Sequence, residues 1–335
     1  MAWYLEQDGD TMKRYLTAPP LLLAAASLLI AATASAQTYP ARPIRMIVPF
    51  PVGGSTDTYA RLAGKLLGEA LGQPVIVDNR AGATGLIGSR LVKDAPADGY
   101  TLLYTTNSAH VIGPLLHKQH AFDPVADFTP ITEALRFPAY VVASTKLPAR
   151  TFKEFIALAK ARQGALSYAS AGTGGGSHLA CEQMLDAAGI KALHVPYSGA
   201  GPAQTSVMSG EVDFLCDSVG NSQPMVRAGK MRGLALAAAQ RSPAIPDIPT
   251  LREEGVPVEA YVWQGVFAPK GLPADIRDRL ATEIARVMRM PDMQARLRKD
   301  GYDPVLQPPE QFSKDLVAEQ AMWARLIAQK NIKAD

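Results

Sequence analysis

Residues 44–72 have the sequence IRMIVPFPVGGSTDTYARLAGKLLGEALG, in which an apolar run is followed by a glycine-containing turn and an amphipathic segment. The apolar run Ile44–Val48 is typical of a buried strand. Apolar residues then recur at helical spacing up to Leu71, with Ser55 as the expected N-cap and Gly72 at the expected C-terminal end. This stretch predicts a strand, a turn and a helix, which is the repeating unit of an α/β fold.

The same alternation continues to about residue 105. A strand is expected at Val75–Val77, followed by a glycine-containing entry at Ala81–Gly85 and a helix that ends near Lys93. The turn Asp98-Gly99 leads into another strand at Tyr100–Thr105. Strands that alternate with helices in this way predict a parallel sheet with helices on both faces.

A second α/β unit begins near residue 151. Thr151 and Glu154 have the spacing of a capping box before a helix that ends near Arg162. A short strand at Leu166–Ala169 then leads into the segment SAGTGGGSH at 170–178 and another amphipathic helix. Further strands are expected at Leu193–Val195, Val212–Leu215, Arg232–Ala237 and Trp263–Ala268, with a proline-rich loop at Ser242–Thr250 and helices from Pro273 onward.

The two units predict an α/β protein of two lobes, with a mostly parallel sheet in each lobe and a ligand cleft between them. We assign residues 37–138 and 266–335 to lobe one and residues 139–265 to lobe two, with crossings near 134–144 and 261–268. Ligands of α/β sheets bind outside the carboxyl ends of the strands. Both glycine-rich loops occupy that position, so we expect both to line the cleft.

The composition of the 335-residue chain excludes several classes of protein. With 47% hydrophobic and 19% charged residues, the chain can bury a core and is not disordered. Its 34 basic residues are scattered, which argues against a nucleic-acid-binding face. Two cysteines are too few for a disulfide-dense scaffold or a cysteine-rich zinc module.

The N-terminal segment has the pattern of a secretory signal peptide. Met12-Lys13-Arg14 precedes the apolar run Leu21–Ala32, which is too short to span a membrane, and Ala34-Ser35-Ala36 forms the cleavage site. We therefore predict residues 1–36 as the signal peptide, a mature chain that begins at Gln37, and a periplasmic protein. Residues 1–11 carry three acidic side chains ahead of the basic pair, so translation starts at either Met1 or Met12.

The two glycine-rich loops can bind an anion. The N-terminus of a helix presents unpaired N–H groups and about half a positive charge, and glycines let the backbone approach a ligand closely. Neither loop contains Arg or Lys, which favours a carboxylate over a fully ionised phosphate. The alternative is that these glycines serve only the strand–helix turns.

Other chemical motifs are incomplete in this sequence. Gly172-x-Gly174-x-x-Ser177 lacks the third glycine of a dinucleotide fingerprint, and no Gly-x-Ser-x-Gly elbow occurs. Ser177 and His178 are adjacent on a helix and cannot form a nucleophile–base pair. His117 and His120 have the i, i+3 spacing of a metal-binding pair, but we expect them on a solvated surface and not in a metal site. We expect no catalytic residues, no metal and no cofactor.

The two cysteines, Cys181 and Cys216, both fall in the second lobe. Cys181 lies in the helix after the second glycine-rich loop, and Cys216 follows the strand Val212–Leu215. A helix that packs on its own sheet can bring them together, so they form either a structural disulfide or two buried thiols.

Eleven sequence motifs occur in order and cover nearly all of the mature chain. They are Tyr39–Arg45, Val48–Asp57, Leu71–Val75, Asn79–Ala83, Asp98–Leu103, Asp127–Ile131, Ser170–Gly174, His194–Gly199, Ala228–Arg232, Pro246–Thr250 and Trp263–Pro269. Together they resemble the Bug family of periplasmic solute-binding receptors, which supplies the extracytoplasmic component of tripartite tricarboxylate transporters.

The resemblance implies a two-lobed "Venus flytrap" fold that binds a small organic carboxylate, largely through backbone amides and bridging waters. Carried over by motif, the implied ligand-binding residues are Phe50, Val52, Gly54, Ser55 and Asp57 in lobe one and Ser170, Gly172, Gly174 and Ser177 in lobe two. Asp57 is either a contact or a helix cap, since a carboxylate would repel the ligand.

The resemblance also implies a partner, a membrane permease of the tripartite tricarboxylate transporter type, and a receptor that acts as a monomer. We expect a non-enzymatic solute-binding protein that does not bind nucleic acid. The alternative functions are an exported ligand sensor that feeds a signalling kinase and an exported α/β hydrolase.

Overall fold

The computed structural model describes residues 39–117, 122–162, 164–330 and 332. The predicted signal peptide and His120 therefore lie outside the described residues. The chain divides after Ala41, and the unit that begins at Arg42 holds the helices and strands described below.

The first sheet has six strands in the order β11-β4-β10-β3-β1-β2. Strand β1 pairs in parallel with β2 and β3, whereas β10 runs antiparallel to β3 and β4, and β11 runs antiparallel to β4. Its strands are β1 (Ile44–Val48), β2 (Val75–Asn79), β3 (Thr101–Thr106), β4 (Phe128–Pro138), β10 (Tyr261–Pro269) and β11 (Asp303–Pro304).

The second sheet has five strands in the order β7-β6-β8-β5-β9. Strand β6 pairs in parallel with β7 and β8, and β5 runs antiparallel to β8 and β9. Its strands are β5 (Tyr140–Ser144), β6 (Ser167–Ser170), β7 (Leu193–Pro196), β8 (Phe214–Asp217) and β9 (Met231–Leu236).

Both sheets are therefore mixed and not mostly parallel as the sequence predicted. The difference comes from β4, β5 and β10, which lie where the chain passes between the two sheets. Only Ala139 separates β4 from β5, and β10 returns antiparallel to β4 along its whole length. The predicted lobe boundary at 265/266 falls inside β10, all of which belongs to the first sheet.

The stretch that opens the fold forms β1 and α2 (Ser55–Leu71) as predicted. The N-cap is Gly54, so Ser55 is the first helical residue and not the cap. Gly72 ends the helix with a left-handed φ of 73°, and its N–H donates to the carbonyl of Gly68.

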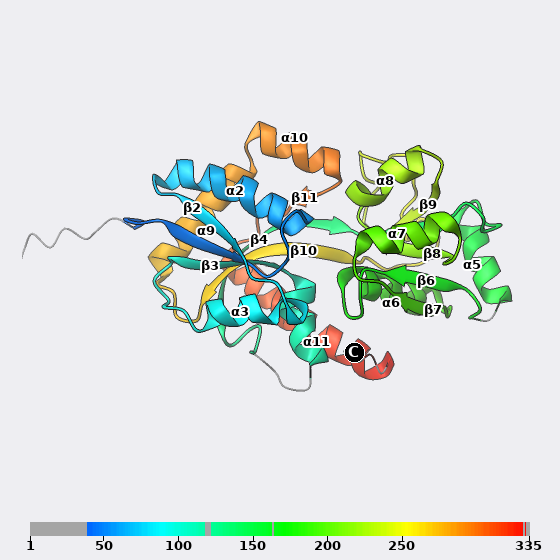
Figure 1. The fold of residues 1–335 in the computed structure, drawn as a ribbon, viewed down its shortest axis with the longest axis horizontal. Helices are drawn as coiled ribbons and strands as arrows, with labels where there is room; N and C mark the ends of the chain where they lie inside the picture. The colour runs from blue at the N-terminus through cyan, green and yellow to red at the C-terminus, as the bar shows by residue number, and fades with distance from the viewer. Residues whose placement is uncertain (1–38, 118–121, 163, 331, 333–335) are drawn as a thin grey trace, which may run out of the picture. The chain divides into compact units, whose positions relative to one another are not determined.

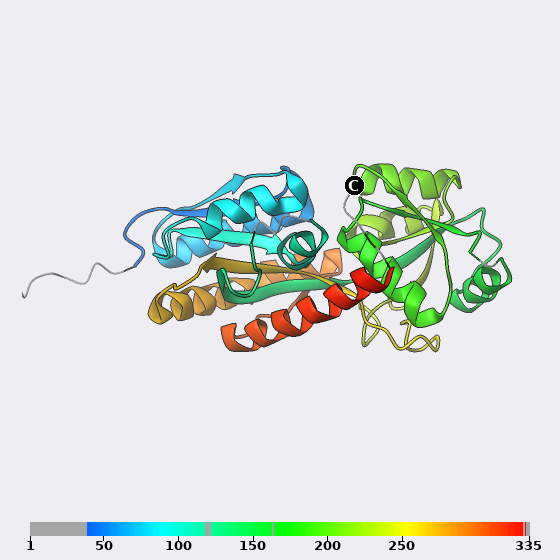
Figure 2. The same ribbon diagram turned by 90° about the horizontal axis from the view of Figure 1, so that it is seen from below.

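Helices cover both faces of each sheet. In Figure 1, α2 and α3 lie on opposite sides of the first sheet, and Figure 2 shows the long α11 beside it. The remaining helices are α3 (Leu86–Lys93), α4 (Gly113–Leu116), α5 (Phe152–Ala161), α6 (Gly176–Ala188), α7 (Ala200–Ser209), α8 (Val219–Arg227), α9 (Ala274–Met288), α10 (Pro291–Asp300) and α11 (Pro309–Lys330), with the short 3₁₀ turn η1 (Ala83–Gly85) and the π-helix η2 (Ser108–Ile112).

The second sheet shows why both of its faces must be covered. Alternate residues of β5 point to opposite faces, so Val141 and Ala143 join the core under α5 and α6, whereas Tyr140 and Val142 join the core under α7 and α8. All four are fully buried. A strand buried on both faces has no polar alternation, which explains why the sequence shows β5 only as an apolar run.

A disulfide joins α6 to the second sheet. Cys181 and Cys216 are bonded, with their Cα atoms 5.5 Å apart. Both cysteines are buried within the core that α6 covers. Within the described ranges, the helices are all too short or too polar to cross a membrane.

Candidate functional site

A cavity of about 170 Å³ is lined by residues that come from elements of both sheets. The lining residues are Ser55, Ser108, Phe137, Ala139, Ala171, Gly176, Ser177, Ala180, Ala200, Cys216, Asp217, Ser218, Asn221 and Val262. Neither Lys nor Arg occurs among these described lining residues, so any positive potential in the cavity must come from oriented backbone groups.

Four α-helices begin at this cavity. Ser55 is the first residue of α2, Gly176 the first of α6 and Ala200 the first of α7, while Ser218 is the N-cap of α8. The π-helix η2 begins there as well, at Ser108. Each α-helix directs the positive end of its dipole and its first-turn N–H groups toward its N-terminus, and in α8 one of these groups, the Asn221 N–H, already donates to Ser218 Oγ. The cavity is therefore suited to an anion held by fixed dipoles.

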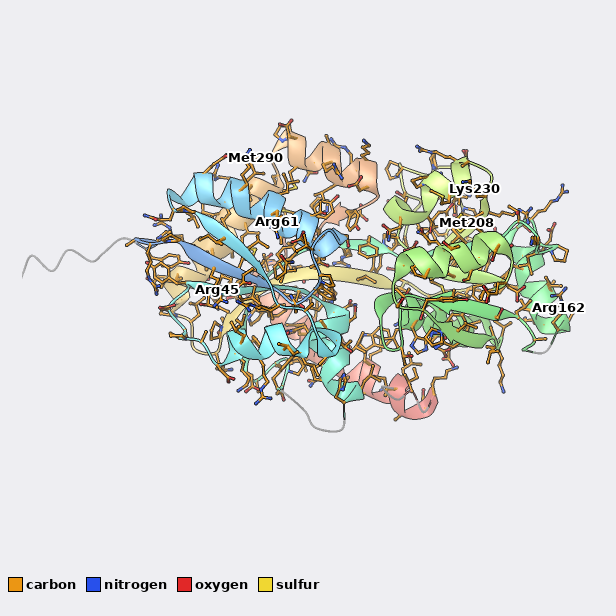
Figure 3. The ribbon with its side chains drawn as sticks, viewed as in Figure 1. Arg45, Arg61, Arg162, Met208, Lys230 and Met290 are labelled. Atoms are coloured by element: carbon orange, nitrogen blue, oxygen red, sulfur yellow. A yellow bond between two sulfur atoms is a disulfide. The ribbon has the colours of Figure 1, made fainter. Side chains whose placement is uncertain are left out.

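The first glycine-rich loop is held by Asp57. Its Oδ2 accepts from the Gly53 N–H at 2.9 Å, its Oδ1 accepts from Asn79 Nδ2 at 2.9 Å, and Arg61 lies 2.9 Å away as an ion pair. Figure 3 labels Arg61 on α2. Burial acts to raise the pKa of Asp57, but hydrogen bonds from Arg61, Gly53 and Asn79 outweigh it, so this pKa is lowered. Asp57 is thus an ionised, buried loop anchor.

The second glycine-rich loop folds back on the first turn of α6. The Ala171 N–H donates to Ser177 Oγ at 2.9 Å, and the Gly174 N–H donates to His178 Nδ1 at 2.9 Å. Gly172 and Gly174 have φ values of 136° and 74°, which only glycine adopts readily. These bonds place the Ser177 hydroxyl at the cavity wall.

One carboxylate, Asp217, lies on the cavity wall, and it is fully hydrogen-bonded. Its Oδ1 accepts from the Ser218 N–H at 2.8 Å and from Asn221 Nδ2 at 3.2 Å. Its Oδ2 accepts from Gln204 Nε2 at 2.7 Å and from Ser222 Oγ at 2.6 Å. With four donors, the carboxylate has little capacity left for a ligand and instead anchors the start of α8.

A larger hollow of about 600 Å³ lies between α2 and β2. A Cβ on Gly64 would lie 3.4 Å from Val75 Cγ1, and one on Gly68 would lie 3.2 Å from the Gln73 carbonyl, so these glycines let the helix approach the strand closely. Val75 begins β2, so the hollow lies at the amino end of a parallel strand. That is the end opposite to the one where α/β sheets bind ligands.

Of the nine ligand-binding residues predicted from sequence, Ser55 and Ser177 line the cavity. The other seven do not line it. Gly54 is the N-cap of α2, Asp57 is buried, and Val52 is 70% exposed. The Phe50 carbonyl accepts from Asn79, and Ser170 is buried beneath the second loop, where Gly172 and Gly174 shape the backbone. The assignment of these seven residues to ligand contacts stays a prediction.

Four polar residues of the cavity lining were not predicted from the sequence: Ser108, Asp217, Ser218 and Asn221. Ser108 follows β3, and Asp217 ends β8, just before α8. A signal was present, because Ser218 and Asn221 have the spacing of an N-cap and its N3 partner directly after a buried strand, and Ser218 Oγ accepts from the Asn221 N–H at 3.3 Å.

Comparison with known proteins identifies the family of this chain. The model of the tripartite tricarboxylate transporter family receptor matches residues 59–332. The chain belongs to this receptor family. Protein BugT of Bordetella pertussis, from the same family, is 35% identical over 324 residues, which cover 96% of this chain and 99% of BugT. The resemblance inferred from the motifs is confirmed, and the family is one of binding proteins and not of enzymes.

Solved structures of similar proteins share the fold. The periplasmic binding protein BugD is 31% identical, with a TM-score of 0.76 over 89% of this chain and all of that one. An R. palustris protein with adipate is 32% identical, with a TM-score of 0.79 over 89% of this chain and all of that one. MatC from Rhodopseudomonas palustris, with bound malate, is 32% identical, with a TM-score of 0.74 over 86% of this chain and all of that one. The predicted two-lobed α/β fold is that of these receptors.

Proposed function

We propose that the protein is a periplasmic receptor that binds a small organic carboxylate in the cavity lined by Ser55 and Ser177. The observation that carries this proposal is the convergence of four α-helix N-termini on a cavity whose described lining holds no cationic side chain. The adipate and malate in two similar structures support the same class of ligand.

The size of the cavity favours a small ligand. A volume of about 170 Å³ is below the range of about 300–1,000 Å³ that drug-sized ligands occupy. Hydrogen bonds to a charged group contribute about 1.5–3 kcal/mol each. Three or four such bonds from amides and hydroxyls are enough for micromolar binding, about −8 kcal/mol, after the costs of association.

A thermal-shift and calorimetric screen of small organic acids tests this proposal. The screen pairs each acid with its uncharged amide, for example adipate with adipamide, because the two have similar shapes and differ in charge. We expect one or more acids to stabilise the protein and the matched amides to have no effect. We also expect affinity to depend little on ionic strength, since the donors are fixed dipoles. Equal binding of an acid and its amide would contradict the proposal.

We further propose that the receptor delivers its ligand to a membrane permease of the tripartite tricarboxylate type. Because all of β10 belongs to the first sheet, we assign residues 37–138 with 261–335 to one lobe and residues 139–260 to the other. Deleting the gene should reduce uptake of the ligand that the screen identifies. A loss of ligand-induced transcription with unchanged uptake would instead identify a sensor.

Intact-mass measurement of periplasmic protein should find a chain that begins at Gln37, and retention of residues 13–36 would contradict a cleaved signal peptide.

A further inference from the structure

Two histidines stack beneath the second glycine-rich loop. His178 is the third residue of α6 and His194 lies on β7, and their rings are 3.8 Å apart at an angle of 5°. Tyr168 of β6 lies against His194, with the ring centroids 4.9 Å apart. His178 is 4% exposed. Neither histidine lines the cavity, so any role that they have in ligand binding acts through the loop residues that they contact.

His178 holds the middle of the loop. Its Nδ1 accepts from the Gly174 N–H at 2.9 Å. An imidazole nitrogen that accepts a hydrogen bond carries no proton, so the ring is neutral and bears its proton on Nε2. Gly174 has a left-handed φ of 74°, and a Cβ there would overlap Leu116. The bond to His178 therefore holds the Gly174 peptide in a conformation that glycine adopts readily.

His194 holds the start of the loop. Its Nε2 lies 2.7 Å from Ser170 Oγ. The same hydroxyl oxygen lies 3.2 Å from the Gly172 nitrogen and 3.2 Å from the Gly172 carbonyl oxygen. The stacked rings thus link two points of the loop. His194 on β7 contacts Ser170, and His178 on α6 contacts Gly174.

We propose that the His178–His194 stack is a positioning device for the second loop, with His178 Nδ1 as its critical atom. The stack fixes the Gly174 peptide and so presents the Gly176 and Ser177 groups to the cavity before the ligand arrives. Donors that are already oriented avoid the entropy cost of ordering on binding. The proposal rests on the carboxylate-binding function, which the loop would serve.

Burial suits His178 to this role. Desolvation, together with repulsion from His194, lowers the pKa of His178 to about 3. The charged form, in which Nδ1 would carry a proton and repel the Gly174 N–H, is therefore absent at neutral pH.

The first test uses the wild-type protein without ligand. Nitrogen-15 NMR should show His178 as the neutral Nε2–H tautomer at pH 7, and the Gly174 amide should exchange slowly with solvent. The Ala171 amide, which donates to Ser177 Oγ, is the internal reference. An Nδ1–H tautomer or a charged ring would overturn the proposal, whether or not the protein binds a carboxylate.

The second test compares two substitutions at one position. In His178→Asn, the side-chain Oδ1 takes the place of Nδ1 and keeps the acceptor, whereas His178→Leu removes it. A hydrogen bond that contributes about 0.5–1.5 kcal/mol corresponds to a change of about 2- to 13-fold in an equilibrium constant. We expect His178→Leu to speed Gly174 exchange and weaken adipate binding by about that factor. His178→Asn should restore both to near the wild-type values.

A control at another buried histidine separates positioning from general destabilisation. His110 is fully buried, stacks on Phe267 and lies 3.0 Å from the Pro124 carbonyl through Nε2, and its Nδ1 has no hydrogen-bond partner among the described residues. His110→Leu should lower overall stability without speeding Gly174 exchange relative to Ala171. Unchanged Gly174 exchange in His178→Leu would overturn the proposal. If His178→Leu does not fold, the tautomer of His178 in the wild-type protein decides whether the proposal holds. If no acid binds the wild-type protein, the receptor function fails, and the exchange result still decides the role of His178.

Discussion

Ser55 and Ser177 line the same cavity although they belong to helices that cover different sheets. Ser55 is the first residue of α2, and Ser177 is the second residue of α6. Each helix follows a strand and a glycine-rich loop, β1 in one sheet and β6 in the other. The same strand–loop–helix unit therefore contributes a hydroxyl and a helix N-terminus to the cavity from both halves of the chain.

Replacing Ser177 by Ala should weaken carboxylate binding. The substitution removes one hydroxyl from the cavity and leaves the Ala171 N–H without its acceptor at 2.9 Å. We expect a loss of about 1–2 kcal/mol, or about 5- to 30-fold in Kd, because the backbone donors remain. Isothermal titration with the tightest-binding acid measures the change.

Ser242→Ala is the matched control for that substitution. Ser242 Oγ also accepts from a backbone N–H, that of Ala244 at 3.3 Å, but Ser242 does not line the cavity. Its replacement should leave Kd unchanged. An equal loss of affinity in both variants would mean that the Ser177 effect is not local.

Gly54→Val should reduce binding while the protein remains folded. Gly54 has an ordinary φ of −72°, and a Cβ there would find only the Pro51 carbonyl, 3.9 Å away. The added side chain would crowd the approach to the first-turn amides of α2. Circular dichroism should show a native fold, and the thermal shift on adding the acid should disappear. A folded variant with an unchanged thermal shift would exclude the first loop from the site.

Gly174→Val should behave differently, because Gly174 has a φ of 74° and a Cβ there would overlap Leu116. We expect this variant to lose stability even without ligand, since Val is strained at positive φ. A melting temperature equal to that of the wild type would contradict the conformation of the second loop described above.

Much of the fold could be predicted because strong periodicity and cap residues mark it locally. The strand Ile44–Val48 has the predicted bounds, and Thr151 Oγ1 accepts from the Glu154 N–H as the capping box predicts. Strands β4 and β5 were missed, because they are buried and contiguous apart from Ala139, without the turn signals that mark the other strands. The mixed direction of the sheets depends on these strands and on β10. The sequence predicts β10 as a strand at Trp263–Ala268, but no local pattern shows that it runs antiparallel to its neighbours.

Only part of the candidate site could be predicted from the sequence, for a similar reason. Glycine-rich loops stand out in a sequence, and they led to Ser55 and Ser177. Ser108 has an ordinary local sequence, and the N-cap pattern at Ser218 marks a helix start but not its neighbours. Only the pairing of β3 with β1 and of β8 with β6 places these serines beside the loops. Register between distant strands is a tertiary property that a single sequence does not specify.

The stability of the protein should fall in acid because of His178. Its folded pKa of about 3 lies below the unfolded value of about 6.5, so the unfolded chain binds a proton first as the pH falls. The stability that the neutral ring contributes is fully present above about pH 6.5 and is lost progressively toward pH 3. At pH 5 the loss is about 2 kcal/mol.

Comparison with His178→Asn isolates that contribution. Burial also lowers the pKa of His110 to about 3, while burial raises the pKa of Glu133 to about 7, which stabilises the fold as the pH falls from 7 to 4.5. Both groups act equally in the two proteins. Urea unfolding should show the wild-type advantage shrinking by about 2 kcal/mol between pH 7 and pH 5. A constant difference would mean that His178 titrates normally.

The disulfide should make the protein sensitive to reductant. Cys181 and Cys216 are separated by 35 residues, and closing such a loop stabilises the fold by about 4 kcal/mol in the chain-entropy model. Thiol titration of the denatured, unreduced protein should find no free thiol. Reduction should lower the melting temperature. Two reactive thiols before reduction would show that the cysteines are not bonded.

A structure of the protein crystallised with the acid that binds most tightly tests the central claim most directly. We expect a ligand carboxylate inside the cavity, with its oxygens about 3 Å from first-turn amides or serine hydroxyls of α2 and α6 and no Lys or Arg side chain in contact. A carboxylate held by a cationic side chain, or bound in the hollow between α2 and β2, would contradict the claim that helix N-termini form the binding site.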